Sequence, residues 1–363
     1  MASKAEEEKG NSRGKGVRTV RMGLVFLGMA SVAWLLLCTY SNSSSYSNVL
    51  FQVFATNTSF GQGIDEILLE MVLRNASMED KTVILTTLNE AWAKPNSIFD
   101  LFLESFHIGN NTKRLLNHLV VICLDEKAFN RCLALHPHCY LLRTKGINFS
   151  NDAFFKTPIY LDMMWRRIEF MIAVLEEGYN FLFTDTDIMW LRDPFPHFFP
   201  DADFQIASDL FSGNSYDVNN KANGGFSYVK SSNKTITFYK FLYYSRKMYP
   251  GNHDQDVFNK IKHDKFFKKI GLQPRFLDTA HFGGFCEPSR DLNLVCTMHA
   301  NCCIGLENKV HDLQILLHDW RRYLSMNPSM QPHASWSVPQ DCRTSFRRSH
   351  SRKNIDSQKK KNN

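Results

Sequence analysis

Residues 181–194 read Phe-Leu-Phe-Thr-Asp-Thr-Asp-Ile-Met-Trp-Leu-Arg-Asp-Pro, and they are the most informative stretch of the sequence. The first three residues are apolar and follow a helical stretch ended by Gly178, which predicts a short buried strand. Asp185 and Asp187 come directly after it, so both leave the carboxyl end of that strand. Because open α/β sheets form their ligand crevice at this end, the stretch predicts an α/β fold with a binding site here.

The two carboxylates predict a site for a divalent cation. Their hard anionic oxygens suit Mg²⁺ or Mn²⁺, and such an ion could bridge the phosphates of a bound nucleotide. An Asp-rich turn is the alternative, because Asp is a common turn residue. Further polar motifs downstream favour the metal site.

Other apolar runs predict more of the same sheet, with strands at residues 83–85, 119–122, 204–207 and 226–229. A helix is predicted after Pro158, because apolar residues between 160 and 175 recur with helical spacing. Strands that alternate with helices predict a mainly parallel sheet covered on both faces, within one large domain.

The N-terminal region predicts a membrane anchor. Residues 22–40 form an uncharged, mainly apolar run that is just long enough to span a bilayer. Arg13, Lys15, Arg18 and Arg21 lie shortly before the run, and no charged residue follows until Asp65, so residues 1–21 are predicted to be cytoplasmic. A cleaved signal peptide is the alternative, but the run is long for one and lacks a clear cleavage site. The sequence favours an uncleaved type II anchor.

The residues beyond the anchor fit a secretory-pathway lumen. Residues 41–63 are rich in Ser and Asn and predict a flexible stem, residues 64–335 form the predicted folded domain, and residues 336–363 read as a basic disordered tail. Eight of the nine cysteines follow the anchor and could pair there, although the sequence does not give their connectivity. Six Asn-x-Ser/Thr sequons agree with this setting, at Asn42, Asn57, Asn75, Asn110, Asn148 and Asn233.

The formal net charge of +7 lies in the two ends of the chain. Residues 1–21 carry +3 and residues 343–363 carry +7, which leaves −3 for everything between them. A charge confined to terminal tails is usually solvated rather than a nucleic-acid surface. The sequence therefore predicts no nucleic-acid partner, and it leaves the oligomeric state open, whether homo-oligomer or hetero-oligomer.

Two polar motifs follow the Asp-x-Asp stretch. Asn223-Gly224-Gly225 opens the strand at 226–229, where paired glycines let the backbone approach a ligand and Asn223 could hydrogen-bond a sugar hydroxyl. A plain turn is the alternative. In His253-Asp-Gln-Asp-Val-Phe-Asn, Asp254 could cap a new helix, and Gln255 lies one turn before Asn259, so both could face one pocket.

Two further groups of residues are candidates. Cys296, His299 and Cys302 have spacing that suits zinc, but disulfides are the expected fate of thiols in an oxidising lumen. His299 would then be free to join Asp185 and Asp187 as a third metal ligand. Lys156, Arg166 and Arg167 lie on or before the helix after Pro158 and could hold a diphosphate, with a solvated helix face as the alternative.

Six stretches, taken in order across residues 80–320, resemble plant nucleotide-diphospho-sugar transferases of glycosyltransferase family 77, which includes rhamnogalacturonan xylosyltransferases and extensin arabinosyltransferases. This resemblance implies a GT-A fold, a nucleotide-sugar donor, a divalent cation and retention of anomeric configuration. The stretches are Lys156-Thr-Pro-Ile-Tyr, Met163-Met-Trp-Arg-Arg-Ile-Glu-Phe, Phe183-Thr-Asp-Thr-Asp-Ile-Met-Trp-Leu-Arg-Asp-Pro, Asn223-Gly-Gly-Phe, His253-Asp-Gln-Asp-Val-Phe-Asn and Phe282-Gly-Gly-Phe-Cys.

The resemblance also implies roles for individual residues. Asp187 would bind the metal directly, with Asp185 assisting at the metal or the ribose. Asp254 or Gln255 would act as nucleophile or front-face stabiliser. The other implied donor-binding residues are Thr86 and Thr87 near the nucleotide and Asn223 at the sugar. The expected donor is a UDP-pentose, the expected acceptor a cell-wall polysaccharide or glycoprotein, and the expected location the Golgi membrane.

Two rival functions fit parts of the sequence. Haloacid-dehalogenase-type phosphatases also carry Asp-x-Asp, but on their first strand and with Thr or Val where this chain has Met189. A luminal sugar-binding or scaffold protein without turnover is the other rival. The full set of carboxylates argues against it, because a pure binder gains little from a costly acidic cluster.

Overall fold

The computed structural model describes residues 58–144, 146–151 and 156–348. The chain divides into two compact units, residues 1–66 and 67–363, and the second unit contains both sheets. The predicted anchor at 22–40 and nearly all of the predicted stem at 41–63 lie outside the described residues. None of the helices that the structure describes is long and apolar enough to span a membrane.

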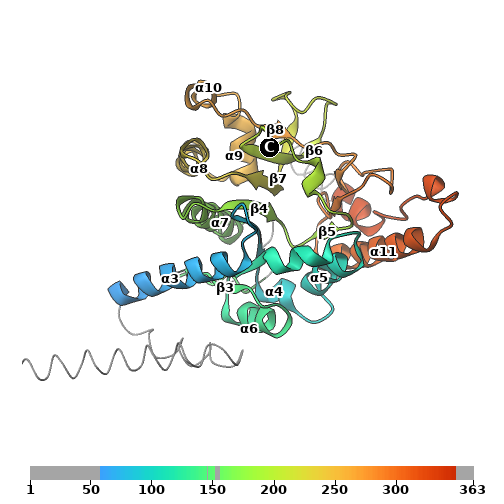
Figure 1. Cartoon of the computed structure of the whole chain (residues 1–363), viewed down its shortest axis with the longest axis horizontal. Coiled ribbons are helices and arrows are strands. Elements are labelled where there is room, and N and C mark those ends of the chain that lie inside the picture. The colour runs from blue at the N-terminus through green and yellow to red at the C-terminus, as the bar shows by residue number, and fades with distance from the viewer. Residues whose placement is uncertain (1–57, 145, 152–155, 349–363) are drawn as a thin grey trace, which may run out of the picture. The chain divides into compact units, whose positions relative to one another are not determined.

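A seven-stranded mixed sheet forms the centre of the second unit, in the order β3-β2-β1-β4-β7-β6-β8 (Figure 1). Four of its strand pairings are parallel, and β7 runs antiparallel to both of its neighbours. The prediction of a mainly parallel α/β sheet is therefore confirmed, with one reversed strand. The strands are β1 (Thr82–Leu88), β2 (Leu119–Cys123), β3 (Cys139–Leu141), β4 (Asn180–Thr184), β6 (Phe204–Leu210), β7 (Lys221–Val229) and β8 (Arg275–Phe276).

The central strands are buried on both faces, as their continuous apolar runs predict. Val83, Ile84 and Leu85 of β1 are all fully buried, although successive side chains of a strand point to opposite faces. One apolar core joins strands of this sheet to five helices. These are α3 (Thr58–Ala76), α7 (Pro158–Glu176), α8 (Asn233–Ser245), α9 (Asp254–Ile261) and α10 (Lys265–Ile270).

Helix α7 has clear start and stop signals. Thr157 caps it by accepting a hydrogen bond from the backbone N–H of Tyr160, and Pro158 occupies the first turn. Gly178 follows its last turn with φ of +79°, a conformation that favours glycine. The chain then enters β4 directly, so α7 and β4 together position the Asp-x-Asp stretch. Three more helices, α4 (Glu90–Ala93), α5 (Ile98–Ile108) and α6 (Glu126–Leu135), lie between β1 and β3 in sequence.

A second sheet has three short strands in the order β5-β10-β9. These are β5 (Ile188–Trp190), β10 (Thr297–His299) and β9 (Phe282–Gly284), and β10 is antiparallel to β5 and parallel to β9. β5 begins one residue after Asp187, so the Asp-x-Asp turn connects the two sheets. Helix α11 (Leu306–Ser325) follows β10.

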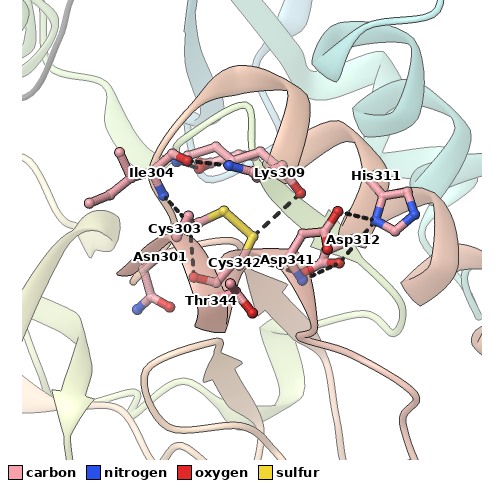
Figure 2. The surroundings of a disulfide bond; sticks show 12 residues. Asn301, Cys303, Ile304, Lys309, His311, Asp312, Asp341, Cys342 and Thr344 are labelled. Atoms are coloured by element: carbon pink, nitrogen blue, oxygen red, sulfur yellow. Dashed lines mark hydrogen bonds and ion pairs between the residues drawn. A yellow bond between two sulfur atoms is a disulfide. The ribbon is translucent and has the colours of Figure 1, made fainter. Parts of the chain in front are cut away.

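Six of the eight cysteines after the predicted anchor pair in three disulfides: Cys132–Cys139, Cys286–Cys302 and Cys303–Cys342. The last one corrects the prediction of a disordered tail from residue 336. Residues 341–348 are helical, Cys342 is buried, and the buried carboxylate of Asp312 on α11 accepts the backbone N–H groups of Gln340 and Cys342. Figure 2 shows this disulfide beside Asp312. Residues 340–348, which follow the predicted boundary at 336, are thus hydrogen-bonded to α11.

Candidate functional site

Three predicted metal ligands meet where the two sheets join. Asp185 and Asp187 follow β4, and His299 ends β10; one donor atom from each lies within 4.8 Å of the others. The register of β10 places His299 opposite Ile188, directly beside Asp187. His299 Nε2 lies 3.2 Å from Asp187 Oδ1 and 3.9 Å from Asp185 Oδ2. Residues more than a hundred positions apart in sequence therefore form one cluster.

Asp187 is buried, and its two carboxylate oxygens face Lys309 and His299. Its Oδ2 accepts a hydrogen bond from Lys309 Nζ of α11, and its Oδ1 faces His299. Burial alone would raise the pKa of Asp187, but Lys309 and His299 outweigh burial and hold that pKa below its usual range. For His299, burial lowers the pKa, and the neighbouring Asp187 more than reverses this and raises it. A carboxylate that stays ionised at this depth is suited to hold a cation.

Arg167 connects Asp185 to a second acidic residue, Asp254. Its guanidinium donates to Asp185 Oδ1 at 2.8 Å and to Asp254 Oδ2 at 2.6 Å, and it lies over the ring of Phe183. Burial raises the pKa of Asp185 in spite of this arginine. Arg167 and Asp254 are almost completely buried, so this pair is fixed in place rather than solvated.

The bulge in β7 makes room for the cluster. β7 shifts its register against β6 after Asn223, and Gly225 accepts the backbone N–H of Asp185 at 2.7 Å. A Cβ on Gly225 would lie 2.5 Å from Asp185 Oδ2 and 2.7 Å from His299 Cε1. Only glycine fits at this position. The paired glycines were predicted to let the backbone approach a ligand; here Gly225 approaches the side chains of Asp185 and His299.

The cluster fits a divalent cation. Two carboxylates and one imidazole are donors that Mn²⁺ accepts, and Mg²⁺ takes the carboxylates. Lys309 already places a positive charge on Asp187. Asp185, Asp187 and His299 are thus the residues that would hold the ion.

Asp209, which sequence reasoning missed, organises the neighbouring polar residues. Its carboxylate accepts amide N–H groups from Asn223 at 2.8 Å, Gln255 at 2.8 Å and Asn301 at 2.7 Å. Gln255 also accepts the backbone N–H of Gly224 at 2.9 Å. Asn223 and Gln255 therefore meet as predicted, but both amides are held in a network centred on Asp209.

Asp254 has a role other than the predicted helix cap. His253 is the N-cap residue of α9, and the Asp254 carboxylate turns to Arg167 instead. Its other oxygen, Oδ1, is buried and has no hydrogen-bond partner within the part of the chain that the structure describes. A buried carboxylate oxygen without a donor is costly, and a ligand hydroxyl would satisfy it. The side chain borders a cavity that also contacts Gly224 and Gln255.

The remaining predicted donor-binding residues lie further from the cluster. Thr86 is fully buried, and its hydroxyl lies 3.1 Å from the hydroxyl of Thr186. The Thr186 hydroxyl donates a hydrogen bond to the backbone carbonyl of Thr87. Thr86 and Thr87 therefore both hold the Asp-x-Asp turn. Lys156 pairs with Asp256 on α9 at 2.6 Å.

Arg166 does not reach the acidic residues of the cluster either. Its guanidinium pairs with Glu169 at 3.3 Å, and the neighbouring Arg167 is the arginine that contacts Asp185 and Asp254. The zinc alternative with Cys302 is wrong, because Cys302 is bonded to Cys286.

Comparison with known proteins gives a consistent result. A family model described as nucleotide-diphospho-sugar transferase matches residues 114–313, which include every residue from Arg167 to Lys309. An uncharacterised protein of Arabidopsis thaliana is 54% identical over 276 residues, 76% of this chain and 73% of that protein. With the mixed α/β sheet, the family match supports a GT-A-like fold.

Two relatives with named activities match shorter parts of the chain. UDP-D-xylose:L-fucose alpha-1,3-D-xylosyltransferase 3 of Arabidopsis thaliana is 23% identical over 36% of this chain and 35% of that protein. UDP-galactose:fucoside alpha-3-galactosyltransferase of Dictyostelium discoideum is 39% identical over 19% of this chain and 11% of that protein.

Proposed function

This chain belongs to the nucleotide-diphospho-sugar transferase family, and we propose that it transfers a sugar from a UDP-sugar to an acceptor, with retention and with Mn²⁺ or Mg²⁺. The observation that carries the proposal is the meeting of Asp185, Asp187 and His299 at the junction of the two sheets. An acidic cluster this deep needs cations, and only part of that need is met by Lys309 and Arg167.

The chemistry requires that negative charge on a departing nucleoside diphosphate be stabilised. A divalent ion held by Asp185, Asp187 and His299 would supply Lewis-acid stabilisation of that charge. Lys309 is the protein's own cation at this place, and its flexible side chain lets the ammonium move from Asp187 to a diphosphate oxygen. Lys309 would then stabilise the negative charge of the leaving nucleoside diphosphate electrostatically.

Asp254 is the best-placed residue to contact the donor sugar. Arg167 keeps one carboxylate oxygen in place, so the unpartnered Oδ1 is presented in a fixed direction. From there it could accept a sugar hydroxyl or stabilise the oxocarbenium-like transition state. Gln255 has both ends of its amide engaged, and we therefore assign it to positioning Gly224 and Asp209 rather than to direct attack.

For the donor we propose a UDP-pentose, and for the acceptor a plant cell-wall polysaccharide or glycoprotein, as in glycosyltransferase family 77. Support comes from the resemblance of the six sequence stretches and from the xylosyltransferase relative. Because one relative is a galactosyltransferase, UDP-galactose is the donor against which a UDP-pentose should be compared.

We propose further that the protein is a Golgi type II membrane protein with its catalytic domain in the lumen. Residues 22–40 and the basic residues before them support the anchor. Three disulfides support an oxidising compartment. The four sequon asparagines in the described part of the chain, Asn75, Asn110, Asn148 and Asn233, are exposed, as glycosylation requires.

The test is release of UDP by the purified full-length protein. It is incubated with UDP-xylose, UDP-arabinose, UDP-galactose or UDP-glucose, with Mn²⁺ and with a chelator. We expect metal-dependent UDP release that is fastest with a pentose donor. Asp187→Asn should lower this rate by about a hundredfold or more, as loss of a main electrostatic stabiliser does.

The matched control is Asp162→Asn, which changes an exposed carboxylate on α7 and should leave the rate unchanged. Equal UDP release by Asp187→Asn and the native protein would contradict the proposal. Binding of UDP-sugar without release would instead support a scaffold, and release of phosphate from a simple monoester would support a phosphatase.

A further inference from the structure

A second group of metal-binding side chains lies at the other end of the small sheet. His197 closes the 3₁₀ turn η2 (Phe195–His197) after β5, His281 directly precedes β9, and Cys296 directly precedes β10. One donor atom of each lies within 4.8 Å of the others. The strand register explains the meeting: Thr297 pairs with both Phe282 and Trp190, so the starts of β9 and β10 lie beside the end of β5.

We propose that His197, His281 and Cys296 bind one zinc ion, with water or a solvent-derived ligand in the fourth position. A thiolate with two imidazoles is a typical zinc ligand set, and it differs from the oxygen-rich set of Asp185 and Asp187. The two sites would therefore select different metals. The zinc site does not depend on the proposed transferase activity.

The surrounding hydrogen bonds already orient two of the three ligands. His281 Nδ1 lies 2.9 Å from the Leu294 carbonyl, which can only accept, so Nδ1 carries the proton and Nε2 offers its lone pair. Metal-binding histidines usually donate their second N–H to such an acceptor. The backbone of Cys296 donates to the His281 carbonyl at 2.8 Å and accepts from Leu191 at 2.8 Å. Both residues are thus anchored to the strands beside them.

The state of the Cys296 thiol agrees with a metal ligand. Among the cysteines that the structure describes, only Cys123 and Cys296 are outside disulfides, and Cys296 is fully buried. A zinc ion would replace the thiol proton with a zinc–sulfur bond and release that proton to solvent.

The two imidazoles need only a small rearrangement. Their rings stack with centroids 4.0 Å apart and planes inclined by 27°. Tetrahedral zinc would bring the three donor atoms to ~3.3–3.6 Å from one another, so the rings must turn toward a common point. Both histidines are half-buried and border solvent, which leaves them room to turn.

The location suggests what the zinc would do. β10 begins directly after Cys296 and ends at His299. At the usual rise per residue of a strand, Cys296 and His299 are therefore ~10 Å apart. The ion would therefore tie together the three strands of the small sheet at one end, while His299 acts at the other. We infer that it holds β10 in the register that points His299 at Asp187.

The experiment measures zinc directly on the full-length protein, purified without chelators, by inductively coupled plasma mass spectrometry. We expect about one zinc ion per chain, at least a fivefold loss in Cys296→Ser and His281→Gln, and no loss in Cys123→Ser, which removes the other buried free thiol. Asp187→Asn should keep its zinc, which separates this site from the transferase site. Equal zinc content in Cys296→Ser and Cys123→Ser would overturn the proposal.

A titration of the native protein guards against variants that fail to fold. Chelator-treated native protein is titrated with Co²⁺ and then with Zn²⁺. We expect a thiolate-to-cobalt charge-transfer band, its removal by Zn²⁺ but not by Mn²⁺, and release of one thiol proton per ion bound at neutral pH. Absence of that band in the folded native protein would overturn the proposal whatever the variants do.

Discussion

The two regions that supply the site are held together in different ways. β1, β2 and β4 of the large sheet are buried by apolar contacts on both faces, and β4 leads into Asp185 and Asp187. Residues 282–342 contain strands of only three residues, and they supply His299, Asn301 and Lys309. This second region has buried apolar side chains of its own, such as Leu313, Leu316 and Trp320 of α11, and two disulfides cross-link it as well. The carboxylates thus follow a strand of the large apolar sheet, whereas the cation and amides that face them come from short strands and a helix that are also covalently cross-linked.

The largest effect should come from breaking the apolar region. Phe181 on β4 is fully buried and packs edge-on against Tyr239. Phe181→Ala should lower the free energy of unfolding by about 3–5 kcal/mol, through lost burial and the cavity left behind. Chemical denaturation followed by circular dichroism measures it. Leu210→Ala, at an exposed apolar position on β6, is the control and should change stability by less than about 0.5 kcal/mol. Similar losses in both variants would contradict a stability centred on β4.

The sequence predicted the first region well because its signals are local. Continuous apolar runs marked β1, β2 and β4, and two carboxylates directly after a strand can leave it only at its carboxyl end. The reversal of β7 was not predictable in this way, since an apolar run does not encode its direction. Lys309 was missed because a single lysine on an amphipathic helix looks like a solvated residue. Only the tertiary packing of α11, which contacts α5, brings Lys309 to Asp187.

Lys309→Met tests the cation of the second region. The change keeps the approximate length of the side chain but removes the ammonium, which contacts Asp187 and lies over the ring of Trp92. We expect UDP release to fall by about a hundredfold, because a stabiliser of the leaving group is lost. Steady-state kinetics measure this. Lys240→Met, at an exposed lysine of α8 paired with Glu176, is the control and should stay within about twofold of the native rate.

A fall in the rate with Lys309→Met that is no larger than with Lys240→Met would mean that Lys309 serves only to neutralise Asp187. The same comparison made with increasing Mn²⁺ sharpens the result. If Lys309 competes with the metal for Asp187, its removal should also tighten Mn²⁺ binding, measured by isothermal titration.

A smaller effect is expected from removing one cross-link of the second region. Cys286–Cys302 spans the segment that carries His299 and Asn301, and Cys132–Cys139 lies far from the site in the first region. Replacing either pair with serine should cost about 2.5–3 kcal/mol of stability by the loop-entropy model, leaving both variants folded. Only loss of Cys286–Cys302 should also lower UDP release, by about tenfold, because His299 and Asn301 lose their fixed positions. Equal rates for the two serine pairs would contradict this.

The two neighbouring arginines of α7 show how a shift of one residue decides which face of a helix a side chain lies on. The sequence made both Arg166 and Arg167 candidates for holding a diphosphate. Arg167 stands three residues after Met164 and four before Met171, both of which are buried. Side chains at these spacings share a face, so the apolar periodicity did contain the signal that Arg167 points inward. It was overlooked because a charged residue on a buried face is rare without a partner, and the partners, Asp185 and Asp254, come from other elements.

Arg166→Gln should therefore have the smallest effect. Its guanidinium pairs with Glu169 at a half-exposed position, where a salt bridge contributes about 0–1 kcal/mol. We expect UDP release within about twofold of the native protein. Arg167→Gln is the matched comparison, because it leaves the half-buried carboxylate of Asp185 and the buried carboxylate of Asp254 without their shared partner. It should lower the stability, and it should lower the rate at least tenfold more than Arg166→Gln does. If Arg166→Gln were instead the more damaging change, the diphosphate would bind on the solvent face of α7, and the site would have to extend away from the Asp185–Asp187–His299 cluster.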